Sequence, residues 1–230
     1  MILHLVTDRR RLAPLETRAG QVRRCLLSQA RAAIAAGIDV VQVREPDLDA
    51  AVLRSLVADL VEMASGTATQ IVVNDRLDVA IAAGASGVHL KGTSVPAARV
   101  RALAPKGFLI GCSVHDEAAA HEAAPHADYL IAGSVFPTIS KPARTSWLGV
   151  AGLAAIVRAV PVPVVGIGGI TVDHIPDIAR SGAAGVAGIG LFMADAPGSP
   201  GSVDAPCLAT ALDRVSRALR AGFDTAGWPS

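Results

Sequence analysis

Polar side chains stand where apolar, β-branched runs of this sequence end. An arginine can grip a phosphate with two parallel hydrogen bonds, and an aspartate can hold a Mg²⁺ that also binds phosphate oxygens. Serine, threonine and lysine add donors of the kind that phosphate oxygens accept. The set therefore suits chemistry on a phosphate ester. The residues are Gln42, Arg44, Asn74, Asp75, Lys91 and Ser113, with Thr138, Ser140 and Lys141 after a further run.

Two apolar runs end in glycines, over residues 163–170 and 185–190. A run of this kind is typical of a strand buried on both faces. Glycines at its end leave backbone N–H groups open to an anion that a Cβ would keep away. A tight turn at Gly168 and Gly169 is the alternative interpretation.

Alternating strand and helix patterns must position these residues. In strict order the pattern favours a single (β/α)8 TIM barrel over an open sheet. In such a barrel the active site lies at the carboxyl ends of the strands, and the last two loops commonly hold a phosphate. We expect one domain over 1–230, with a frayed tail from about 222. The expected strands are 2–7, 39–44, 70–74, 87–90, 108–112, 128–132, 164–166 and 185–189, and the expected helices are 16–36, 48–64, 77–83, 96–104, 116–124, 149–159, 172–181 and 205–221.

Composition narrows the class of partner. The net charge of +1 argues against nucleic acid, which would need a basic stripe. No apolar span is long enough for a membrane helix, and the first residues are too short for a signal peptide. The three cysteines lack CxxC spacing, which fits reduced thiols. We therefore expect a cytoplasmic protein; its oligomeric state stays open, a homo-oligomer included.

Six short motifs in order resemble the thiamine-phosphate synthase family, whose relatives include a thiazole tautomerase. The resemblance runs from residue 3 to about 193. It implies a barrel enzyme that joins an aminopyrimidine methyl diphosphate to a thiazole phosphate and releases pyrophosphate with Mg²⁺. The motifs are Gln-Val-Arg at 42–44, Asn-Asp-Arg at 74–76 with Asp78, Gly-Val-His-Leu at 87–90, Gly-Cys-Ser-Val-His at 111–115, Phe-Pro-Thr-Ile-Ser-Lys at 136–141 and Gly-Ile-Gly-Gly-Ile at 166–170.

The resemblance also implies a role for each matching residue. It makes Arg44, Ser113 and Lys141 catalytic, at the diphosphate, the pyrimidine and the pyrophosphate respectively. It makes Asp75 a Mg²⁺ ligand. The implied substrate contacts are Gln42, Asn74, Thr138, Ser140, Gly168, Gly169, Gly188 and Ile189.

This chain departs from the family at several positions. A lysine expected two residues after Arg44 is Pro46, and a second metal-binding aspartate is missing from the Lys-Gly-Thr-Ser segment at 91–94. Gly190 replaces a serine, and Ser134 replaces the histidine of the tautomerase branch. Lys91 is a candidate to replace the missing lysine. Three hypotheses follow: a slowed synthase, an isomerase of thiazole phosphate, or a non-catalytic binder of thiamine-like phosphates.

Histidines and charged residues also have structural interpretations. His89 lies inside an expected strand and is more typical of a satisfied core histidine than of a catalyst. His115 begins an expected helix, with a role as base the lesser alternative, and His4 is expected at a solvated or strand-start position. Arg44 at the end of an apolar strand favours function, with pairing to Glu45 as the alternative.

Overall fold

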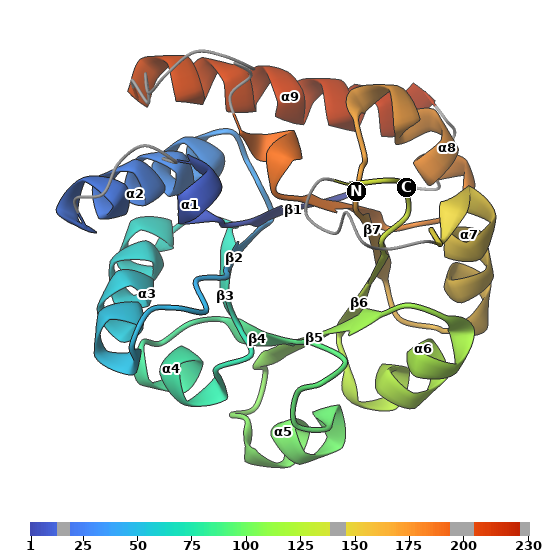
Figure 1. Ribbon diagram of the computed structural model, residues 1–230, viewed down its shortest axis with the longest axis horizontal. Helices are drawn as coiled ribbons and strands as arrows, with labels where there is room; N and C mark the ends of the chain where they lie inside the picture. The colour runs from blue at the N-terminus through green and yellow to red at the C-terminus, as the bar shows by residue number, and fades with distance from the viewer. Residues whose placement is uncertain (13–18, 139–145, 194–204, 226–230) are drawn as a thin grey trace.

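A closed parallel barrel forms the centre of the molecule. The computed structural model describes residues 1–12, 19–138, 146–193 and 205–225. Its strands pair in sequence order, and β1 closes the barrel by pairing with β8 (Figure 1). The predicted (β/α)8 barrel is confirmed. The strands are β1 (Ile2–Val6), β2 (Val40–Val43), β3 (Gln70–Asn74), β4 (Gly87–Leu90), β5 (Leu109–Val114), β6 (Tyr129–Gly133), β7 (Val164–Ile167) and β8 (Gly185–Gly188).

Helices surround the barrel on the outside (Figure 1). The long α9 packs against α2 and α8 and so closes the ring beside β1. The α-helices are α1 (Arg9–Leu12), α2 (Ala19–Ala35), α3 (Ala50–Ala64), α4 (Leu77–Ala82), α5 (Ala97–Leu103), α6 (Glu117–Ala123), α7 (Gly149–Ala159), α8 (Ile175–Arg180) and α9 (Ala205–Thr225), and the 3₁₀ turns are η1 (Ala124–His126), η2 (Val172–His174) and η3 (Gly190–Phe192).

Strand residues alternate between two cores. Leu3 and Leu5 of β1 belong to the large apolar cluster shared with the helices. Tyr129 and Ile131 of β6 belong to a small separate cluster inside the barrel. Because successive side chains of a strand point to opposite faces, the short β-branched runs can fill both cores at once.

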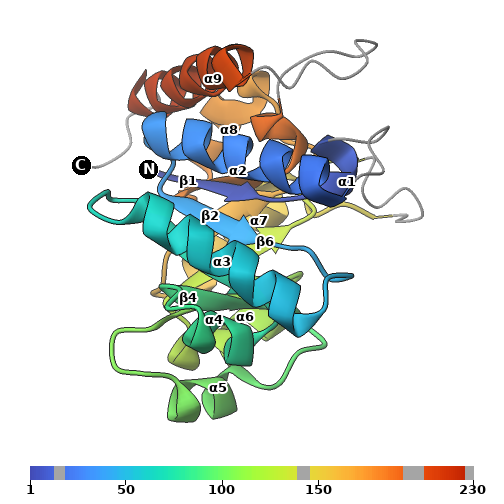
Figure 2. The same ribbon diagram turned by 90° about the vertical axis from the view of Figure 1, so that its left-hand side faces the viewer.

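Two expectations about the chain ends need correction. Helix α9 continues to Thr225 and buries Phe223, which is 1% exposed, so the tail expected from about residue 222 starts no earlier than 226. Residues 226–230 lie outside the described part. No helix was expected between the first strand and residue 16, yet this segment contains the short helix α1, which lies at the end of the barrel toward which β1 points (Figure 2).

Candidate active site

Arg44 and Glu45 lie at the carboxyl end of β2 and do not pair. The Arg44 side chain is exposed, and its backbone N–H donates to Thr7 Oγ1 at 3.0 Å. The buried Glu45 accepts from Thr7 Oγ1 and from Arg9 Nη1, each at 2.8 Å. The alternative of an Arg44–Glu45 pair is therefore wrong. No ion pair within the described residues engages the Arg44 guanidinium, which leaves it open to an anion at the barrel mouth.

Arg9 links this rim to the next loop residue, Asp47. Their hydrogen bonds lower the pKa of the Asp47 carboxyl to about 2 and raise the pKa of the Arg9 guanidinium. Arg10 joins Asp47 at 2.9 Å. These contacts fix α1 against the loop after β2.

Asp75 follows β3 and is held by the loop after β4. Its Oδ2 lies 2.5 Å from Lys91 Nζ, and its Oδ1 accepts a hydrogen bond from Ser94 Oγ. The Lys91 backbone N–H donates to Ser94 Oγ at 2.8 Å. Asn74, the last residue of β3, is half-buried and stands in register with His89. Lys91 thus reaches Asp75 rather than the position near Pro46 where a lysine is missing.

The donor set at Asp75 does not fit the Mg²⁺ expected there. Mg²⁺ prefers near-octahedral oxygen ligands, commonly one or two carboxylates with substrate phosphates. In this site the Lys91 ammonium occupies one oxygen of the Asp75 carboxylate, and the Ser94 hydroxyl occupies the other. No group of three or more His, Cys, Asp or Glu that could hold a metal occurs among the described residues. A divalent cation at Asp75 would have to displace the Lys91 ammonium.

Ser113 on β5 is half-buried and contacts a buried histidine. Its Oγ lies 2.8 Å from His89 Nε2, and His89 Nδ1 lies 3.3 Å from the Tyr129 hydroxyl. Burial lowers the pKa of His89 to about 3, against the opposing charge of Asp75, so the imidazole is neutral near neutral pH. Burial raises the pKa of Tyr129, which therefore keeps its proton. His89 is a core histidine as expected, yet it also fixes the candidate hydroxyl of Ser113.

His4 extends this polar layer across the barrel interior. Its side chain is fully buried, so the expectation of a solvated position is wrong. Its Nε2 lies 3.1 Å from Gln42 Nε2, and Nδ1 has no hydrogen-bond partner in the described part of the chain. Burial, followed by the nearby His89, lowers the pKa of His4. Gln42 is 2% exposed and lies below the rim, so its expected substrate contact stays a prediction.

A glycine makes room for this polar layer. A Cβ on Gly111 would lie 2.1 Å from Tyr129 Cζ and 2.6 Å from His89 Nδ1. His89 and Tyr129 stack with ring centroids 5.7 Å apart. Only glycine at position 111 lets the two rings occupy the barrel interior together.

Gly168 and Gly169 follow β7 and press against the loop after β6. Both have positive φ, at 100° and 64°. A Cβ on Gly168 would lie 2.6 Å from Ser134 Cβ, and one on Gly169 would lie 2.2 Å from the Pro137 carbonyl oxygen. The Gly168 carbonyl accepts from the Phe136 N–H at 2.9 Å. The tight-turn interpretation is thus sufficient to explain both glycines, and their expected contact with phosphate stays a prediction.

The neighbouring loop after β8 is built from Gly188, Ile189 and Gly190. Gly188 ends the strand and is buried, while Ile189 and Gly190 open the 3₁₀ turn η3. Arg11 of α1 reaches this loop, with Nη2 3.2 Å from the place where a Gly190 Cβ would stand. The glycine that replaces the family serine therefore leaves room for a guanidinium.

The loop after β6 is described only in part. Thr138 is half-buried and lies in the described part of the loop. Ser140 and Lys141 lie outside the described residues, so their predicted roles stay predictions. His115 turns its Nδ1 to the Gly133 carbonyl oxygen at the end of β6.

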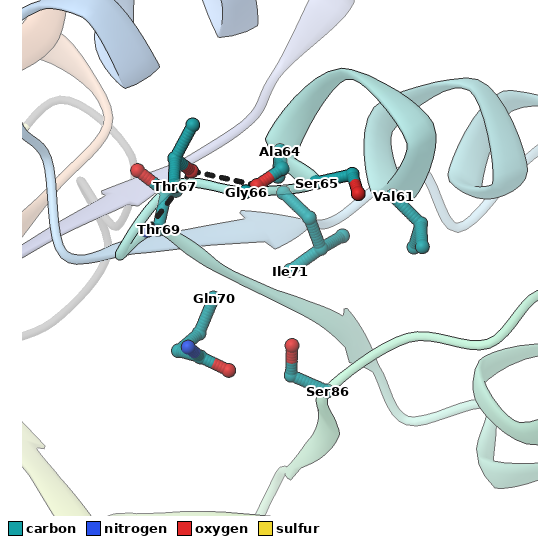
Figure 3. A pocket seen from close by; sticks show the side chains of 9 residues that line it. All are labelled: Val61, Ala64, Ser65, Gly66, Thr67, Thr69, Gln70, Ile71 and Ser86. Carbon is teal, nitrogen blue, oxygen red and sulfur yellow. Dashed lines mark hydrogen bonds between the residues drawn. The ribbon is translucent and has the colours of Figure 1, made fainter.

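One hollow lies at the opposite end of the barrel. It opens between the loop that precedes β3 and Ser86, which precedes β4 (Figure 3). None of its lining residues carries a titratable side chain, and Thr67 Oγ1 donates to the Ala64 carbonyl at 2.7 Å. Residues at the amino-terminal face of such barrels serve stability rather than catalysis. The hollow is lined by Val61, Ala64, Ser65, Gly66, Thr67, Thr69, Gln70, Ile71 and Ser86.

The sequence model of the family described as thiamine monophosphate synthase matches residues 12–192. The chain belongs to this family. Thiamine-phosphate synthase from Methanoculleus marisnigri is 41% identical over 195 residues, which cover 84% of this chain and 89% of the relative. The enzyme of the same name from Roseiflexus sp. strain RS-1 is 35% identical over 94% of this chain and 89% of the relative. A solved thiamine phosphate pyrophosphorylase from Pyrococcus furiosus superposes with a TM-score of 0.76 at 29% identity and covers 98% of this chain and 96% of that one.

Family membership confirms the resemblance seen in the sequence, and the place of the site at the strand ends stays a prediction. Arg44, Asp75 and the two glycine loops follow strands at the same end of the barrel, and Ser113 is the penultimate residue of β5 at that end. Sequence reasoning missed the ties from His89 to Ser113 and from Lys91 to Asp75. In the described residues, no helix has the length and apolar character that a membrane span requires.

Proposed function

We propose that this chain is a thiamine-phosphate synthase, a transferase that joins an aminopyrimidine methyl diphosphate to a thiazole phosphate and releases pyrophosphate. Membership of the family, with relatives of that name at 35–41% identity, is the observation that carries the proposal. The free Cys25 and Cys112 support a cytoplasmic place for it.

Leaving-group charge is what such a site has to stabilise. Departure of pyrophosphate from the pyrimidine methyl carbon leaves an electron-rich cation on one side and concentrated negative charge on the other. Fixed cations aimed at the departing oxygens lower this barrier most. In the proposal Arg44 and Lys91 meet the diphosphate at the mouth above β2 and β4, and Lys141 joins them from the loop after β6.

Ser113 receives the pyrimidine in this proposal. The neutral His89 holds the Ser113 hydroxyl in one orientation at 2.8 Å, and that orientation costs nothing when the substrate arrives. Asn74 and Gln42 supply amide groups on the same side of the barrel. The described donor set at Asp75 does not fit Mg²⁺, so no step of the proposal passes through a metal.

The thiazole phosphate belongs at the two glycine loops in this proposal. Gly168 and Gly169 lie against Phe136 and Pro137 of the loop after β6, and Gly188 and Ile189 lie at and just after the end of the neighbouring β8. Such loops after strands seven and eight commonly bind phosphate in this fold. Ser140 is the further proposed contact of the thiazole phosphate, and it lies outside the residues that the structure describes.

The isomerase and the non-catalytic binder are not favoured. The relatives compared above carry the synthase name, and the histidine of the tautomerase branch is Ser134 here. The decisive assay measures pyrophosphate released from the pure protein with both substrates and with each one alone. Release that requires both substrates supports the synthase. Conversion of thiazole phosphate alone would favour the isomerase, and no turnover with tight substrate binding would favour the binder.

A further inference from the structure

Lys91, Asp75 and Ser94 form a closed triad at the barrel mouth. The Lys91 ammonium lies 2.5 Å from Asp75 Oδ2, and Ser94 Oγ donates to Asp75 Oδ1. The Lys91 side chain is 49% exposed and that of Asp75 is 29% exposed. The ammonium therefore sits where solvent or a ligand can still reach it.

Backbone contacts hold the triad in place. The Asp75 N–H donates to the His89 carbonyl at 2.9 Å, and Asp75 has a positive φ of 65°, which is uncommon for any residue except glycine. The Lys91 N–H donates to Ser94 Oγ at 2.8 Å. Asp75 is thus tied to β4 by its backbone and to the loop after β4 by both carboxylate oxygens. Such ties distinguish the Lys91–Asp75 pair from a loose surface ion pair.

We propose that the Lys91 ammonium takes the place of a divalent cation in this site and binds the diphosphate of the substrate directly. The inference rests on the proposed function, since it names how that reaction's leaving group is held. An ammonium carries three donors. Asp75 takes one of them and keeps the nitrogen at the mouth, and the other two face the diphosphate oxygens.

Ser94 stands where a second carboxylate would be needed to hold a metal beside Asp75. Its hydroxyl lies within hydrogen-bonding reach of Asp75, so an acid at position 94 would bring two carboxylates together. Such a pair needs a divalent cation to offset its charge. With a serine there, Asp75 and Lys91 sum to zero charge without any metal. The cation beside Asp75 is therefore one that the chain itself supplies.

The experiment measures the binding of inorganic pyrophosphate by titration calorimetry, in a chelator and in excess Mg²⁺. The wild-type protein should bind pyrophosphate in the chelator, and Mg²⁺ should change the affinity by less than about threefold. Lys91→Met should weaken binding in the chelator by roughly tenfold or more, the effect of one hydrogen bond to a charged group. Lys106→Met is the matched control, because Lys106 is an exposed lysine elsewhere on the surface and should leave binding unchanged.

A second readout follows the metal itself. Titration with Mn²⁺ alone, followed by electron paramagnetic resonance, should show no tight site in the wild type. Lys91→Ala with Ser94→Asp should create one, and that double variant should bind pyrophosphate only when the metal is present. Circular dichroism checks each fold, and Lys91→Gln replaces Lys91→Met should the latter unfold.

The outcomes separate this inference from the proposed function. Wild-type binding that requires Mg²⁺, or a Lys91→Met variant as tight as the parent, would overturn the inference. Product formation that needs Mg²⁺ would support the proposed synthase activity and contradict the proposed role of Lys91. Metal-free binding of pyrophosphate without any product would support Lys91 as an anion-binding cation and contradict the proposed synthase activity.

Discussion

The two histidines buried in the barrel should make the fold sensitive to mild acid. His4 and His89 are held neutral because burial lowers the pKa of each, to about 3 for His89. In the unfolded chain both titrate near the ordinary value of about 6.5. Below that pH the unfolded state binds more protons than the folded state, so stability falls as the pH falls. The loss continues until the folded pKa is reached.

The magnitude follows from the width of that window. Between about pH 7 and about pH 5 the slope rises toward about 1.4 kcal/mol per pH unit as the unfolded imidazole gains its proton, so His89 costs the fold ~2 kcal/mol, and His4 adds a loss of the same sign. The result does not depend on how far the folded pKa lies below 5. The Asp47 carboxyl, with its pKa lowered to about 2, contributes stability that is lost only below about pH 4. A loss of ~2 kcal/mol from His89, with the further loss from His4, is a large share of the ~5–15 kcal/mol that holds an ordinary domain together.

Urea unfolding followed by circular dichroism measures this loss at about pH 7 and about pH 5. His89→Gln should reduce the difference between the two pH values by ~2 kcal/mol, because one of the two neutral imidazoles is gone. His121→Gln is the control, since His121 is exposed on α6 and should leave the difference unchanged. If the free energy of unfolding of the wild type differs by less than about 1 kcal/mol between the two pH values, His4 and His89 are not held neutral by burial.

Three further predictions concern the loops and the site. Gly169→Ala should lower the free energy of unfolding by about 2–4 kcal/mol in urea titrations, because alanine disfavours the positive φ and its Cβ would displace the loop after β6. Gly84→Ala is the control: Gly84 also has a positive φ, 71°, but open space around it, so the loss should be about 1 kcal/mol. Equal losses would contradict the contact between Gly169 and the loop after β6. His89→Asn should lower kcat of pyrophosphate release about tenfold and keep KM within about threefold of the parent. In the double variant with Ser113→Ala the further loss of kcat should be small, and full additivity would show that the two residues act separately. Glu45→Gln should lower the free energy of unfolding by about 2 kcal/mol at pH 7 in the same urea titration, because the ion pair with the largely buried Arg9 is lost. An unchanged urea midpoint would count against that ion pair.

The barrel could be predicted because its signal is local. Short β-branched runs, glycines at their ends and helix patterns between them repeat along the chain, and parallel strands covered by helices leave few other arrangements. The alternative pairing of Arg44 with Glu45 can be excluded from the sequence by a similar argument. Successive residues at a strand end point to opposite sides, so the two side chains diverge, and Glu45 meets Arg9 instead.

The polar layer inside the barrel was harder to see. His4, Gln42 and His89 each stand within an apolar run, where their spacing along the strand places them on the inner face. The period-two pattern could have revealed this for each strand alone. Their mutual contacts depend on the register between strands, which the pattern does not specify. The reach of Lys91 to Asp75 depends on the path of two loops and has no periodic signal at all.

Product analysis by mass spectrometry tests the central claim most directly. The pure protein is given the pyrimidine diphosphate and the thiazole phosphate, and the formation of thiamine phosphate is followed over time. We expect one thiamine phosphate for each pyrophosphate released, and a rate roughly tenfold or more lower in Arg44→Met, because Arg44 supplies a cation at the barrel mouth that no ion pair among the described residues engages. Absence of thiamine phosphate from a folded wild-type protein, with both substrates intact, would contradict the account.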